Sequence, residues 1–108
     1  MKKIMNFTTS RKACEWCTNA RHLLLYVARE VNFHHSSVAD VQLDYYCRKS
    51  CGEVEVGLLM ILLQQLFSYL KEQELKSFNT CTKYWEILNL VMSSYKNGYP
   101  PPYKKYIN

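Results

Sequence analysis

Hydrophobic residues recur along most of this chain at the three- and four-residue steps of amphipathic helices. In the first such segment the apolar stripe consists of Ala13, Cys17, Ala20, Leu24, Val27 and Val31. Further segments begin near residues 37, 53 and 79, and Gly98 followed by Pro100 ends the last one. With short loops between them, the pattern predicts an all-α fold, a small bundle of about four helices.

Two positions compete for the start of the first helix. Ser10 would place the Cys14 and Cys17 pair inside the helix, whereas Thr18 as N-cap would leave the pair just before it. The difference matters because it decides which way the two thiols face.

The third predicted helix is apolar nearly all round between Val56 and Leu63. A helix of this kind is either the centre of a bundle or covered by a partner. Its apolar surplus predicts a surface for a protein partner or for a second copy of the chain in a homodimer. The candidate partner-binding residues in this helix are Leu58, Leu59, Leu62 and Leu63.

The net charge of +5 belongs to the two ends of the chain. Residues 1–12 hold four basic residues and residues 96–108 hold three, in both cases without an acid, whereas the body between them has seven basic and nine acidic residues. We therefore divide the chain into a basic segment (1–12), a helical domain (13–97) and a Pro/Tyr/Lys tail (98–108). An alternative function follows from the basic ends, which suit association with nucleic acid, although a basic face on the folded body is not evident.

Four of the five cysteines are spaced as two close pairs, which suits zinc. Cys14 and Cys17 form one pair, and Cys47 and Cys51 form the other, with His34 or His35 as alternative ligands. Residues three or four apart share a helix face, so each pair could chelate from one side. A zinc ion would then brace the first two helices, which would add stability to a small chain.

Two other interpretations of the cysteines stay open. Cys-x2-Cys also occurs in thiol oxidoreductases, which would make Cys14 or Cys17 a reactive thiol at a helix start. Alternatively, the cysteines are small buried apolar residues, and Cys17 and Cys81 lie squarely on apolar stripes. No Ser/His/Asp arrangement, paired-acid signature or glycine-rich phosphate loop is present, so we expect a protein that is not an enzyme.

The tail contains Pro100, Pro101, Pro102 and Tyr103, and this Pro-Pro-x-Tyr sequence resembles the ligand motif of WW domains. The resemblance implies that Pro100 and Pro101 enter an aromatic groove of the partner and that Tyr103 enters a second pocket. The competing interpretation is a helix terminator followed by a tail packed on the bundle.

Together these features predict a small, non-catalytic interaction protein that acts as an adaptor or accessory factor. Neither a secretory signal nor a membrane-spanning apolar run is visible, so we expect an intracellular protein of the cytoplasm or nucleus. Small size, a candidate docking peptide and Lys/Asn/Tyr-rich usage also suit a virus-encoded accessory protein.

Overall fold

Three helices make up the described part of the structure, a computed structural model that describes residues 10–34, 38, 53–77 and 82–107. Helix α1 spans Ser10–Glu30, α3 spans Glu53–Ser77 and α4 spans Thr82–Asn97. These residues contain no strand, which confirms the all-α prediction for this part of the chain. The helix predicted from residue 37 lies, apart from Val38, outside the described residues, and so the count of four helices stays a prediction.

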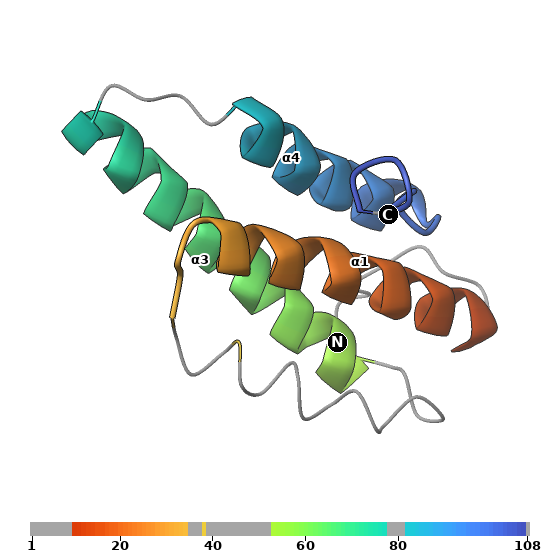
Figure 1. Cartoon of the computed structure of the whole chain (residues 1–108). Coiled ribbons are helices and arrows are strands. Elements are labelled where there is room, and N and C mark those ends of the chain that lie inside the picture. The colour runs from red at the N-terminus through yellow and green to blue at the C-terminus, as the bar shows by residue number, and fades with distance from the viewer. Residues whose placement is uncertain (1–9, 35–37, 39–52, 78–81, 108) are drawn as a thin grey trace.

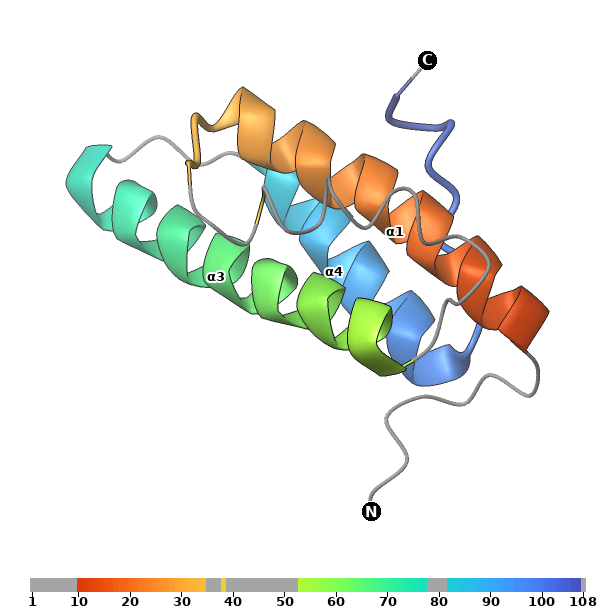
Figure 2. The same ribbon diagram turned by 90° about the horizontal axis from the view of Figure 1, so that it is seen from below.

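The three helices pack side by side as a small bundle (Figure 1). Helices α1 and α3 run in the same direction and α4 runs opposite to both, as the two views agree (Figure 2). Their facing apolar stripes form one core of almost fully buried side chains. These are Trp16, Leu23, Leu24 and Val27 from α1, Leu59, Leu62, Leu63 and Leu66 from α3, and Ile87, Leu88 and Val91 from α4. Burial of these stripes is the main source of stability for helices in a small domain.

Left-handed residues end two of the helices. Gly98 has φ 75° after α4, and the amides of Gly98 and Tyr99 both donate to the carbonyl of Ser94. This arrangement satisfies carbonyls at the helix end and confirms the stop predicted at Gly98. Asn32, with φ 56°, plays the same part after α1, and the amide of Phe33 donates back to the carbonyl of Ala28 at 2.8 Å.

The cysteine pair lies inside α1, because the helix begins at Ser10. Thr18 is therefore not an N-cap, and that alternative is wrong. Its hydroxyl instead donates to the carbonyl of Cys14, four residues earlier, at 2.8 Å. Threonine satisfies its hydroxyl in this way when it lies within a helix rather than at its start.

A buried hydrogen bond joins α1 to α4. The indole Nε1 of Trp16 donates to the hydroxyl of Ser94 at 2.9 Å, and this hydroxyl donates in turn to the carbonyl of Val91 at 2.8 Å. Trp16 and Ser94 are both fully buried, and the Trp16 ring lies 5.7 Å from that of Tyr95. Burial also raises the pKa of Tyr95 above its ordinary value of 10.0. The Ser94 hydroxyl thus provides a hydrogen-bond partner for Nε1, the only polar atom of the buried Trp16 side chain.

A second buried polar contact joins α1 to the first turn of α3. Arg21 and Glu55 form an ion pair with both side chains almost completely buried. Within the described residues, Arg21 Nε and Glu55 Oε1 have no hydrogen-bond partner. An incompletely satisfied buried pair adds little net stability, but it penalises any register that separates the two charges.

The far end of the bundle is closed by contacts near the start of α4. Lys83 donates to the hydroxyl of Tyr26 at 2.6 Å, and this hydrogen bond raises the pKa of Lys83 above its ordinary value of 10.5. The neighbouring Tyr84 donates to Glu30 at 3.1 Å, so α1 and α4 are joined at both ends of their contact.

Replacing Ser94 with alanine removes the acceptor of the Trp16 indole N–H and leaves that group buried without a partner. We expect Ser94→Ala to lower the free energy of unfolding by about 1–3 kcal/mol. This change in the free energy of unfolding is measured by urea denaturation, with tryptophan fluorescence as the signal. Ser93→Ala, at an exposed neighbouring position, is the matched control and should change stability by less than about 0.5 kcal/mol. Equal stabilities of the two variants would contradict the role given to Ser94.

Replacing one member of the Arg21–Glu55 pair strands the other charge in the interior. We expect Arg21→Met and Glu55→Leu each to destabilise the fold by about 3–5 kcal/mol. The double variant should be clearly more stable than either single one, because it leaves no buried charge unpaired. A double-mutant cycle in urea provides the measurement, and strictly additive losses would show that the two charges do not interact.

Candidate functional site

The C-terminal tail passes along the side of α1 away from α3 (Figure 2), and Tyr103, Tyr106 and Ile107 pack against the edge of the core. Asn19 donates to the carbonyl of Pro101 at 2.9 Å. One turn further along α1, the exposed imidazole of His22 stacks on the ring of Tyr103, with centroids 4.8 Å apart and planes 22° apart. Asn19 and His22 share a helix face because they lie three residues apart.

The other tail residues differ in how far they are covered. Pro101 is buried, Pro100 and Tyr103 are half-buried, and Pro102 is exposed. Tyr99 exposes 42% of its surface at the start of the tail. Further on, Tyr106 and Ile107 pack against the edge of the core. Of the three residues that the WW-ligand resemblance singles out, Pro101 and Tyr103 are therefore engaged by α1 and Pro100 is half-buried, as the competing interpretation of a tail packed on the bundle expects.

Two clefts lie where the tail meets α1. One, of about 510 Å³, is lined by Cys14, Glu15, Thr18, Asn19 and Pro100. The other, of about 290 Å³, is lined by Asn19, Pro102, Tyr103, Lys104 and Lys105. Asn19, which donates to the tail, thus borders both clefts.

The structure places most of the predicted partner-binding leucines of α3 in the core. Leu59, Leu62 and Leu63 expose at most 1% of their surface, and Leu58 is partly buried against the same core. In this arrangement they hold the bundle together and do not form an exposed surface. Among the described side chains of α3, Ile61 is the large apolar one that is exposed, at 47%.

The cysteine pair of α1 is divided between core and surface. Cys17 is fully buried among the core residues, and Cys14 is half-buried beside the larger cleft. His34 is exposed after the end of α1, whereas Cys47, Cys51 and His35 lie outside the described residues. Among residues that the structure describes, no group of three His, Cys, Asp or Glu side chains is placed to hold a metal ion. Zinc binding therefore stays a prediction that depends on the second pair.

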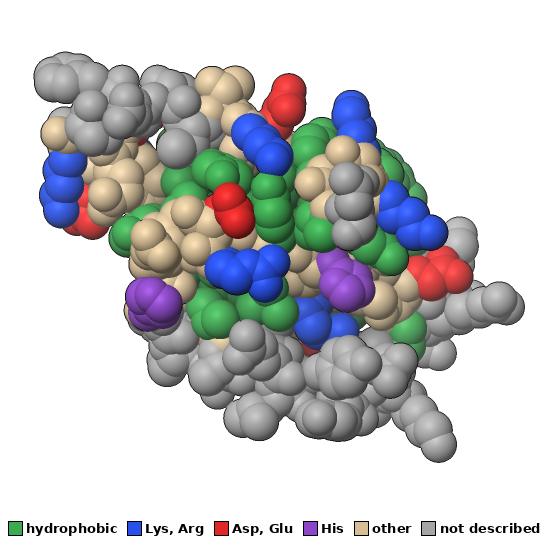
Figure 3. Space-filling view, viewed as in Figure 1, with side chains coloured by type: hydrophobic (Ala, Val, Ile, Leu, Met, Phe, Trp, Pro, Cys, Tyr) green, Lys and Arg blue, Asp and Glu red, His purple; other side chains and the backbone are tan. Residues whose placement is uncertain are grey.

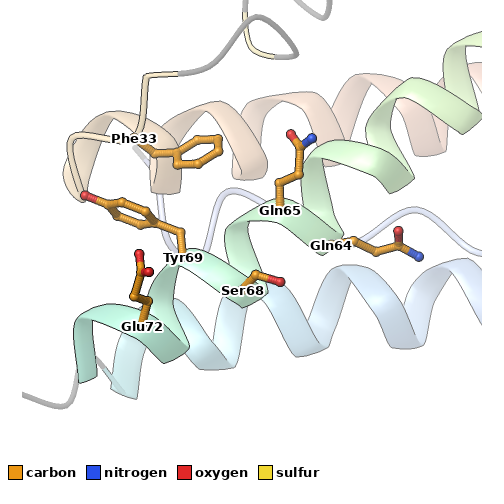
Figure 4. Close-up of a pocket in the computed structure, with 6 residues that line it drawn as sticks. All are labelled: Phe33, Gln64, Gln65, Ser68, Tyr69 and Glu72. Carbon is orange, nitrogen blue, oxygen red and sulfur yellow. The ribbon is translucent and has the colours of Figure 1, made fainter. Parts of the chain in front are cut away.

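A further cleft, of about 380 Å³, lies between the end of α1 and the outer side of α3 (Figure 4). Its lining is Phe33, Gln64, Gln65, Ser68, Tyr69 and Glu72. The Tyr69 hydroxyl donates to the carbonyl of Val31 at 3.1 Å, and its ring meets Phe33 edge-on at 5.1 Å. These contacts fix one end of the cleft, while Gln64 and Ser68 are exposed at the other.

Basic and acidic side chains are interspersed on the face that carries α1 and α4 (Figure 3). The first nine residues, which hold part of the predicted basic segment, lie outside the described part of the chain. None of the three described helices is long and apolar enough to cross a membrane.

Sequence reasoning missed the contacts that hold the tail. Asn19 and His22 are ordinary polar residues on a helix, and their partners are 82 positions away for Asn19 and on the same distant tail for His22. Comparison with family models, with curated protein sequences and with solved structures found no match.

The different burial of the two α1 cysteines predicts different reactivity. In the native protein, iodoacetamide should label Cys14 at least about tenfold faster than Cys17, because Cys17 must wait for the core to open. Peptide mapping by mass spectrometry measures both rates in one sample. In denaturant the two rates should become similar, which serves as the control. Equal labelling of the native protein would show that α1 does not bury Cys17.

Proposed function

We propose that this chain is a non-catalytic interaction protein that binds a partner through its C-terminal Pro-Pro-x-Tyr segment. The partner chemistry is that of a WW domain, an aromatic groove that takes prolines in an extended backbone and a tyrosine beside them. The observation that supports the proposal is that α1 of the same molecule binds this segment. It holds Pro101 by its carbonyl and Tyr103 by its ring, on one face of α1.

Binding to α1 and binding to a WW domain exclude each other. Both surfaces require the ring of Tyr103, and Pro101 is buried when the tail lies on α1. A partner therefore binds only the fraction of molecules whose tail has left the helix, and its apparent affinity falls by that fraction. The docked tail makes the interaction weaker and conditional.

The polar contact with α1 is small. One hydrogen bond from Asn19 contributes about 0.5–1.5 kcal/mol net, and one aromatic stack contributes a similar amount. These two contacts alone correspond to a preference for the docked tail of roughly 5- to 150-fold, and the burial of Pro101 and the packing of Tyr106 and Ile107 add to it. The clefts beside Asn19 and the exposure of Tyr99 and Pro102 give a partner places to begin displacement.

A titration with a WW domain of the class that binds Pro-Pro-x-Tyr tests the proposal. A synthetic peptide of residues 96–108 should bind about tenfold more tightly than the full chain, because the peptide has no α1 to leave. His22→Ala in the full chain should recover most of this difference, and Tyr103→Ala should abolish binding. Isothermal titration calorimetry provides the dissociation constants.

The controls separate release of the tail from loss of the fold. Ser93→Ala, on the exposed side of α4, should bind like the unmodified chain. His22→Ala should keep the circular dichroism spectrum of the parent, because His22 is exposed on α1. A peptide that fails to bind the WW domain would refute the proposed ligand. Equal affinities of peptide and full chain would refute the competition with α1.

A further inference from the structure

The middle of α3 has an outer side without charge, whereas Lys71, Glu72 and Lys76 are exposed toward its end. Residues 56–70 contain no Asp, Glu, Lys or Arg over about four turns, although Ile61, Gln64 and Ser68 are exposed. The exposed positions of α1 and α4 include Glu15, Arg29, Lys83, Glu86 and Lys96. Depletion of charge around an exposed large apolar side chain distinguishes the centre of a protein interface from the remaining surface.

The outer residues of α3 form a stripe with symmetric spacing. Gly57, Ile61, Gln64 and Ser68 follow one another at steps of four, three and four residues. When such a helix is laid antiparallel on a second copy of itself, Gly57 of one copy meets Ser68 of the other, and Ile61 meets Gln64. Small residues then face each other at both ends of the contact, and larger ones fill its middle.

Gly57 is not explained by packing within one copy. A Cβ atom added at this position would have no atom within 4 Å, so nothing in the described structure requires the absence of a side chain. Glycine within a helix costs roughly 0.5–1 kcal/mol relative to alanine. A small residue at this place suits the close approach of a helix from another molecule.

The neighbouring cleft contains a polar atom in need of a donor. Gln65 Oε1 is buried and has no hydrogen-bond partner among the described residues. Figure 4 shows Gln65 pointing toward α1, while Gln64 and Ser68 project from the side of α3 away from it. Gln65 therefore lies off the stripe, whose members Gln64 and Ser68 project from the other side of the helix.

From these observations we propose that α3 is the interface of a homodimer in which two copies pair antiparallel through Gly57, Ile61, Gln64 and Ser68. The absence of charge on this stripe favours a second copy of the chain as the molecule that covers it. The exposed positions of α1 and α4 carry charges of both signs, whereas the stripe carries none, so two copies can meet along it without opposing like charges. The symmetric spacing makes the stripe complementary to itself, as a two-fold interface requires.

Sedimentation velocity and native mass spectrometry over a concentration series test the proposal on the full chain. We expect a monomer–dimer equilibrium. Ile61→Glu should raise the dissociation constant at least tenfold, because it buries a charge near the two-fold axis. Gln64→Glu, at an exposed polar position, is the second variant in case the first affects folding. Ser93→Glu adds the same charge to the exposed side of α4 and should leave the equilibrium unchanged.

The register is tested by pairing two thiol variants. An equimolar mixture of Ile61→Cys and Gln64→Cys should form a disulfide between the introduced thiols, identified by peptide mapping, several-fold more than either variant alone. A similar yield from each single variant would overturn the antiparallel register. A monomer at every concentration up to the sub-millimolar range, or a dimer that ignores both Ile61→Glu and Gln64→Glu, would overturn the interface itself.

Discussion

The hydrogen bond from Trp16 to Ser94 is the constraint on which the other features of the molecule depend. Trp16 is a large core residue, and burying its indole N–H without a free-energy cost requires a hydrogen-bond acceptor at that place in the core. That acceptor, Ser94, lies in the last turn of α4, four residues before Gly98, where the chain turns away from the helix. The bond therefore fixes the height of α4 against α1, and with it the point at which the tail leaves the bundle.

The position of the tail follows from this height. Gly98 turns the chain immediately after α4, so the three prolines begin beside the first half of α1. Asn19 lies three residues after Trp16 and four before Leu23, at the edge of the core face of α1, and His22 lies on the exposed side of this edge, where both meet the tail. Helix α1 thus has two recognition faces, one for the core and one for a segment of its own chain. The described tail lies on the side of α1 away from α3 (Figure 2), and so the tail and the uncharged stripe of α3 do not compete for space.

Much of the bundle could be predicted from the sequence, because helical periodicity is a local signal. The apolar stripe of α1, the start of α3 and the stop at Gly98 all follow from spacing or from single residues with fixed conformational preferences. The start of α1 was ambiguous because serine and threonine both cap helices and only the full geometry shows that Thr18 bonds within the helix.

The polar contacts could not be predicted in this way. Arg21 and Glu55 resemble ordinary surface charges in the sequence, and their burial depends on the parallel packing of α1 and α3. Leucine patterns also do not separate core from interface: Leu59 and Leu62 pack inward, whereas Ile61 between them is exposed. The interface proposed on α3 rests on the missing charge at outer positions, a feature that the apolar pattern does not contain. Long-range pairs such as His22 with Tyr103 leave no local trace at all.

The folded-back tail also affects how the protein should be handled. Tyr103, Tyr106 and Ile107 cover the edge of the core, so their removal would uncover apolar surface on α1 that water then has to solvate. A shortened chain ending at Gly98 would therefore differ from the full chain in solubility as well as in length. A purification tag attached to the C-terminus would act on the same surface, and the choice of terminus for such a tag would decide which state of the molecule is observed.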